Sequence, residues 1–138
     1  MRRRGLAVKE RPEGRGDRPL AQAVDPGKIR AHSSSKRPSV QPGERAVLYA
    51  AVWQAVFAIV EIVGEPEHDP DRTRWAWRFP IRPLTVVRDL HEAPAVEEIG
   101  VFPQSLWRHS HIRISDEQLA AAEAAIAQTA DRIARRGA

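Results

Sequence analysis

The sequence predicts an α+β domain, in which a small β-barrel is flanked by short helices and followed by a long C-terminal helix. Between Arg45 and Ser115, strand-like segments repeatedly bring large aromatic side chains to one face. The last of these segments is rich in Arg, His and Ser. An amphipathic run with helical spacing follows Ser115. This layout predicts a barrel with an aromatic pocket that would hold a flat ring.

The first two strands are predicted over residues 45–51 and 55–63, which are apolar and rich in Ala, Val and Ile. Val52, Trp53 and Gln54 form the predicted hairpin turn between them. The apolar run 46–60 is shorter than the roughly 20 residues that a membrane-spanning helix requires. We therefore expect buried strands and no membrane partner. The polar run 67–72 is expected to be a loop.

A third strand is predicted from Arg74 to Ile81 because apolar and polar side chains alternate there. Its predicted aromatic face consists of Trp75, Trp77, Phe79 and Ile81. Arg78 and Arg82 lie on the opposite face with Pro80. Because Pro80 and Pro83 cannot donate ladder hydrogen bonds, the strand is expected to lie at an edge or to carry a bulge. The sequence of residues 84–90 is also compatible with a continuation of this strand.

The remaining elements end in a capped helix. Pro94 and Gly100 bracket a predicted short helix, and a further helical turn is predicted over residues 103–106. A last strand spans residues 107–114. Ser115 and Gln118 form a capping box for the final helix. The stripe expected to pack on the sheet consists of Leu119, Ala122, Ile126, Thr129 or Ala130, and Ile133.

The basic charge is concentrated near the N-terminus. Residues 1–45 carry 12 Lys and Arg against 5 Asp and Glu, whereas residues 46–138 carry 10 against 13. Residues 1–40 are rich in Arg, Gly, Pro and Ser without an apolar period, so we expect a flexible basic segment followed by a domain over residues 41–134. Such a segment either contacts phosphates or is disordered without a partner. The lack of cysteine and the short apolar run 6–8 favour a cytoplasmic protein.

Three stretches, at residues 41–49, 75–81 and 108–115, resemble the EVE domain of the PUA-like superfamily. The resemblance covers about residues 40–134 and implies a PUA-like pseudo-barrel, related to the YTH, ASCH and PUA folds, whose members bind RNA or modified bases in DNA. The matched positions are Tyr49 for the strand aromatic, Asp69, Pro70 and Asp71 for the acidic loop, and Arg108, Ser110 and Ile112 for the terminal strand.

The sequence also departs from the family pattern. Glu44 replaces an aspartate, Ala50 and Ala51 replace the His-Ser that often follows the tyrosine, and the opening tryptophan strand has no recognisable counterpart in residues 1–40. These departures concern the chemistry of the pocket and the start of the sheet.

Together, these observations predict a module that binds nucleic acid, RNA or DNA, with an extruded or modified base in an aromatic pocket. The expected pocket residues are Tyr49, Trp53, Trp75, Trp77 and Ser110. The expected backbone-binding residues are Arg78, Arg108, His109, His111 and Arg113. The structural alternatives, which involve no binding site, are that the tryptophans belong to the core and that the polar residues form a solvated strand face. The competing function is a non-catalytic module that binds protein or a small molecule.

Catalysis and cofactors have little support in the sequence. No nucleophile elbow, P-loop or paired-carboxylate motif is present, so no enzyme and no cofactor is expected. His109 and His111 share a strand face, as two metal ligands would, and His68 is a candidate third ligand. The spacing does not match a compact metal-ligand signature, so no metal is expected.

Overall fold

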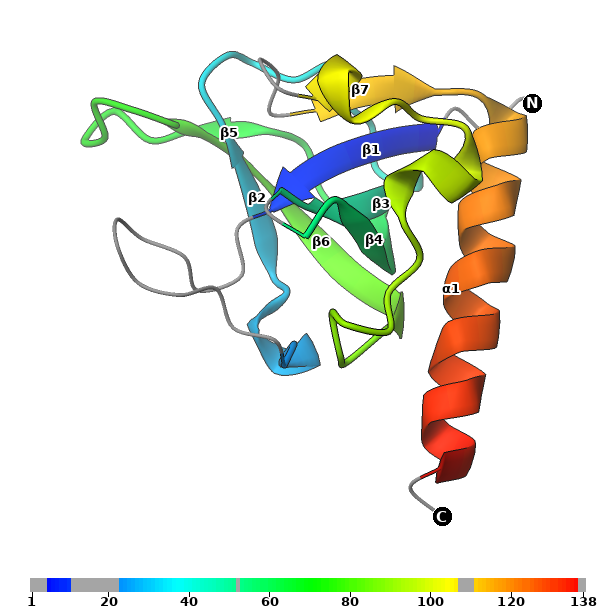
Figure 1. Cartoon of the computed structure of the whole chain (residues 1–138). Helices are drawn as coiled ribbons and strands as arrows, with labels where there is room; N and C mark the ends of the chain where they lie inside the picture. The colour runs from blue at the N-terminus through cyan, green and yellow to red at the C-terminus, as the bar shows by residue number, and fades with distance from the viewer. Residues whose placement is uncertain (1–4, 11–22, 52, 107–110, 137–138) are drawn as a thin grey trace.

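One curled sheet of seven strands forms the centre of the molecule, and a long helix packs along it (Figure 1). The computed structural model describes residues 5–10, 23–51, 53–106 and 111–136. Its strands are β1 (Gly5–Glu10), β2 (Ala31–Ser34), β3 (Arg45–Ala50), β4 (Ala55–Ile62), β5 (Glu67–His68), β6 (Trp77–Val86) and β7 (His111–Ile114). Its helices are the short turns η1 (Pro26–Lys28), η2 (Val96–Ile99) and η3 (Pro103–Leu106), and the long helix α1 (Asp116–Arg136).

The strands follow the order β2-β6-β4-β3-β1-β7, and β5 also pairs with β6. All neighbouring pairs are antiparallel except β1 and β3, which run parallel, with Leu6 opposite Ala46 and Glu10 opposite Ala50. The curled sheet and the helix beside it give the predicted α+β pseudo-barrel (Figure 1).

The β3–β4 hairpin supplies nearly half of the buried core residues, as its apolar sequence predicts. Every residue of β3 after Arg45 is buried, and β4 is buried except for Glu61. Trp53 and Gln54 lie in the turn as predicted, and Gln54 adopts a φ of 51° there, while Val52 lies outside the described residues. Pairing with β1 on one side and β6 on the other covers both edges of this hairpin. Continuous burial is therefore consistent with a hairpin at the centre of the sheet.

Strand β6 confirms the predicted alternation from Trp77 onward and corrects it before that residue. Phe79 and Ile81 are buried, while Arg78, Pro80 and Arg82 are exposed. Trp75 lies outside the strand with a φ of 48°, so the expectation that the strand begins at Arg74 is wrong. The prolines mark a bulge rather than an edge, because the register with β4 shifts beside the Val60–Pro83 pair and β6 has partners on both sides.

Residues 1–40 were expected to contain little regular structure, and this expectation is wrong because they contain the strands β1 and β2. β1 lies inside the sheet between β3 and β7, and Ala7 is fully buried. β2 pairs with β6 and buries His32 and Ser34. Both strands have ladder partners that satisfy their backbone groups, so a very short apolar run and a polar Ala-His-Ser-Ser segment still form strands. The chain therefore has an opening strand, and the ordered domain begins before residue 41.

Helix α1 begins as predicted. The Ser115 N–H donates to Gln118 Oε1 at 2.9 Å, and the Gln118 N–H donates to Ser115 Oγ at 3.0 Å, so the capping box is formed. The predicted stripe faces the sheet: Leu119, Ala122, Ile126 and Thr129 are buried, and Ile133 packs at the edge of the core. Among the described residues, no helix is both long enough and apolar enough to cross a membrane.

Candidate functional site

The connection between β5 and β6 is a compact polar turn that presents a tryptophan to solvent. The Asp69 N–H donates to the Ala76 carbonyl at 2.8 Å, and Asp69 Oδ1 accepts the N–H of Asp71 at 3.0 Å. These bonds close the hairpin in an Asx-type turn. Beyond the turn, Trp75 has a positive φ of 48° and keeps 49% of its surface exposed. A bulky residue in this conformation is unfavourable by about 1–2 kcal/mol, so the surrounding turn must hold it there.

A surface pocket of about 510 Å³ opens beside this turn. Its walls come from the segment after β2 and from the β5–β6 hairpin, and they consist of Ser35, His68, Arg72, Thr73, Arg74, Trp75, Ala76 and Trp77. Two tryptophans and two arginines line it, and none of the lining residues is acidic. The pocket is thus both aromatic and cationic.

The tryptophans of the pocket are held by cation–π and ring contacts. The Arg74 guanidinium carbon lies 5.0 Å from the centroid of the Trp75 ring, and that of Arg37 lies 5.5 Å from the Trp77 ring. His68 meets Trp77 at 4.9 Å with its ring tilted by 60°. These distances are within the range of favourable cation–π and edge-on aromatic contacts. Trp77 is therefore partly covered by Arg37 and His68, and Trp75 is the more accessible ring.

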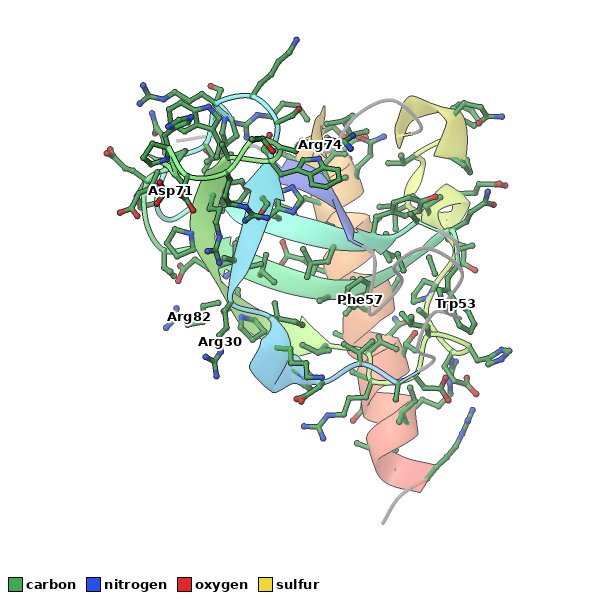
Figure 2. All side chains as sticks on the ribbon, turned by 90° about the vertical axis from the view of Figure 1, so that its left-hand side faces the viewer. Arg30, Trp53, Phe57, Asp71, Arg74 and Arg82 are labelled. Carbon is green, nitrogen blue, oxygen red and sulfur yellow. The ribbon has the colours of Figure 1, made fainter. Side chains whose placement is uncertain are left out.

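The structure brings Trp75 and Trp77 together in one pocket and places Tyr49 and Trp53 elsewhere. Tyr49 is buried in the core, where its hydroxyl donates to the Ala51 carbonyl at 3.4 Å and burial raises its pKa. Trp53 does not line the pocket and meets the His91 ring at 5.0 Å. Figure 2 shows Trp53 away from Asp71 and Arg74 at the hairpin. Ser110 lies outside the described residues.

The predicted backbone-binding residues have different surroundings. Arg78 is exposed on the outer face of β6, opposite Ser33 of β2 and Glu67 of β5 in register. Arg113 is engaged within the molecule, because it pairs with Glu44 at 2.5 Å and also donates to the Ser39 carbonyl. Arg108 and His109 lie outside the described residues, as does the side chain of His111. Of this set, Arg78 is the described residue that remains available on the surface.

Several pocket residues were missed by the sequence prediction. Ser35 belongs to the segment that was expected to be flexible, as does Arg37, which contacts the pocket residue Trp77. His68 and Arg72 belong to residues 67–72, which were expected to be a loop, but Glu67 and His68 form the short strand β5. Thr73 follows this segment. The usable signal was the density of Arg around the two tryptophans at residues 72–78. Within the described part of the chain, no group of three or more His, Asp and Glu side chains is arranged to hold a metal ion.

No family model and no curated protein matches this chain. Solved structures do match. A hypothetical protein from Leishmania major aligns with a TM-score of 0.62 at 11% identity, covering 91% of this chain and 95% of that one. Human THYN1, crystallised in complex with DNA containing 5-methylcytosine, aligns with a TM-score of 0.57 at 12% identity, covering 91% and 97%. The fold is a PUA-like pseudo-barrel.

A third neighbour supports the same fold. Rpa0253 from Rhodopseudomonas palustris aligns with a TM-score of 0.57 at 15% identity and covers 93% of both chains. The alignments extend over nearly the whole length of each protein. At these identities the likeness concerns the fold.

Proposed function

We propose that this chain is a non-catalytic nucleic-acid-binding module of the EVE type, which holds an unpaired base against Trp75. The observation that carries the proposal is the surface pocket lined by two tryptophans, each contacted by an arginine, and by no acidic residue. A protein core would not leave Trp75 half exposed, and a simple solvated loop would not need to hold it at a positive φ.

The chemistry of the pocket suits a nucleobase. Stacking of a base on an aromatic side chain is worth about 1–3 kcal/mol and tolerates all bases. Arg72 and Arg74 lie where they can meet the phosphates next to a stacked base. Selectivity for a modified base would come from contacts to its edge and from the lower cost of extruding a base that pairs poorly.

The fold neighbour human THYN1 supports the same class of partner, since it was crystallised with DNA containing 5-methylcytosine. Fold likeness alone does not carry function. The proposal therefore depends on the pocket, and the neighbour indicates which modified base to test first.

The first test is binding of single-stranded DNA and RNA oligonucleotides, with and without 5-methylcytosine, at low and high salt. Tryptophan quenching reports contact in the natural protein, and anisotropy of a labelled oligonucleotide compares variants. We expect Trp75→Ala to weaken binding about ten-fold or more, because it removes one stacking platform. Phe102→Ala is the matched control, since Phe102 is an exposed aromatic that does not line the pocket.

Three outcomes would change the assignment. Equal weakening by Phe102→Ala and Trp75→Ala would remove Trp75 from the site. Quenching that disappears completely at high salt would leave a purely electrostatic contact without a base pocket. Absence of binding to every oligonucleotide would favour a module that binds protein or a small molecule.

A further inference from the structure

The outer face of β6 carries a row of arginines that continues away from the pocket. Arg78 and Arg82 alternate with the buried Phe79 and Ile81, so both point to the outside of the sheet. Arg30 joins them, because its carbonyl accepts the Ile81 N–H at 2.9 Å at the start of β2. Figure 2 shows Arg30 and Arg82 projecting from the same side of the molecule, with Arg74 further along it. We refer to Arg30, Arg78 and Arg82 as the outer strip.

Within the part of the chain that the structure describes, one guanidinium of the outer strip is paired with a carboxylate. Arg82 binds Glu61 of β4 at 2.5 Å, and 62% of the Arg82 side chain is still exposed. Arg78 lies opposite Glu67 in register, but among the described residues it makes no ion pair. Arg30 donates its Nε–H to the Gly27 carbonyl at 3.0 Å, which is a neutral acceptor. The strip therefore keeps a positive charge despite the two nearby glutamates.

We propose that the outer strip carries the sugar-phosphate backbone of the strand whose base enters the pocket, and that Glu61 restrains this contact by occupying Arg82. The inference rests on the proposed function and assigns a path to the backbone. Arg78 and Arg82 are four residues apart on a strand, a separation of about 13 Å. The path would thus run along β6 from the hairpin toward η1, and a flexible single strand can follow it.

The role of Glu61 follows from the competition for Arg82. A phosphate offers an arginine the same bidentate, charge-assisted hydrogen bonds as a carboxylate does. Arg82 must exchange Glu61 for a phosphate when a strand binds, and the carboxylate left behind repels that phosphate. Removing the charge of Glu61 should therefore strengthen binding, whereas a purely structural ion pair would give no gain.

The test compares Glu61→Gln with Glu123→Gln by anisotropy of a labelled single-stranded oligonucleotide across a salt series. The control also removes one negative charge and also releases an arginine, Arg45, but on the α1 side of the molecule. We expect Glu61→Gln to tighten binding about three-fold and to steepen the slope of log K against log salt by up to about 0.7. Glu123→Gln should change both quantities less.

Arg78→Ala provides a second variant, since Arg78 has no ion pair among the described residues. Arg135→Ala at the far end of α1 is its control: it removes the same charge, and the ion pair with Asp131 that it breaks is highly exposed and contributes little. We expect Arg78→Ala to weaken binding about three-fold at low salt and to flatten the slope. Equal effects of each variant and its control would overturn the path while leaving the Trp75 pocket intact. If the natural protein binds no oligonucleotide, the path and the proposed function fail together.

Discussion

Two described residues other than glycine, Gln54 and Trp75, have a positive φ, and they illustrate two uses of the same backbone conformation. Gln54 completes the β3–β4 turn, and its carbonyl accepts the Val96 N–H at 3.0 Å. At Trp75 the same conformation places the indole ring in the lining of the pocket. At Gln54 the conformation serves a turn, so a glycine should be accepted there. At Trp75 the side chain itself is needed.

We predict that Gln54→Gly raises the free energy of unfolding by about 0.5–1 kcal/mol. The exposed side chain makes no hydrogen bond among the described residues, the Val96 contact uses only the backbone, and glycine relieves the strain of the positive φ. Urea denaturation measures the change. Gln128→Gly is the control, because the same substitution on the exposed side of α1 should destabilise by about 1 kcal/mol. Destabilisation by both variants would show that Gln54 is not strained.

At the scale of elements, the last turns of α1 are attached to the loop before η2 through Glu92. This carboxylate meets Arg136 at 2.9 Å and Arg132 at 3.4 Å. The Arg136 hydrogen bond and charge lower the pKa of Glu92, with a smaller contribution from Arg132. Because the pKa is lowered in the folded state, the stabilisation is present above the ordinary glutamate pKa and is lost as the pH falls through the folded value.

We therefore expect Glu92→Gln to lower stability at neutral pH, and the difference from the natural protein to disappear as the pH is lowered below the ordinary glutamate range. The loss should be small because the pair is exposed. Thermal unfolding across a pH series measures it. Glu97→Gln serves as control, since that exposed side chain has no ion pair among the described residues. A pH-independent difference would exclude the ion pairs as its cause.

The sequence predicted the elements whose signals are local. The β3–β4 hairpin, the capping box at Ser115 and the buried stripe of α1 all follow from periodicity and from capping chemistry within a few residues. β1 and β2 were not predicted, because their stability comes from partners that are distant in the sequence. Of the residues expected in the aromatic pocket, Trp75 and Trp77 line the surface pocket. The contributions of Ser35 and Arg37 beside Trp77 could not be predicted, because they depend on the pairing of β2 with β6.

At the scale of the whole molecule, β1 determines whether the N-terminal segment is a free arm or part of the fold. We predict that Ala7→Asp lowers the free energy of unfolding by at least about 3 kcal/mol, because it places an unpaired charge at a fully buried position between β3 and β7. Ala124→Asp, on the exposed side of α1, is the control and should change stability by less than about 0.5 kcal/mol.

Chemical denaturation followed by circular dichroism compares the two aspartate variants. Similar small effects would mean that residues 5–10 contribute little to the folded state, as a flexible basic arm would. A large loss confined to Ala7→Asp would show that the N-terminal strand is an integral part of the sheet.

The position of β1 between β3 and β7 also has a consequence for synthesis of the chain. β1 (Gly5–Glu10) is synthesised well before β7 (His111–Ile114), yet the two strands are neighbours in the sheet. One edge of β1 therefore has no partner until β7 has been made, and an unpaired strand edge attracts other strands. We expect a nascent chain to complete this sheet only after residues 111–114 have left the ribosome, so that the edge of β1 is open to wrong pairing until then.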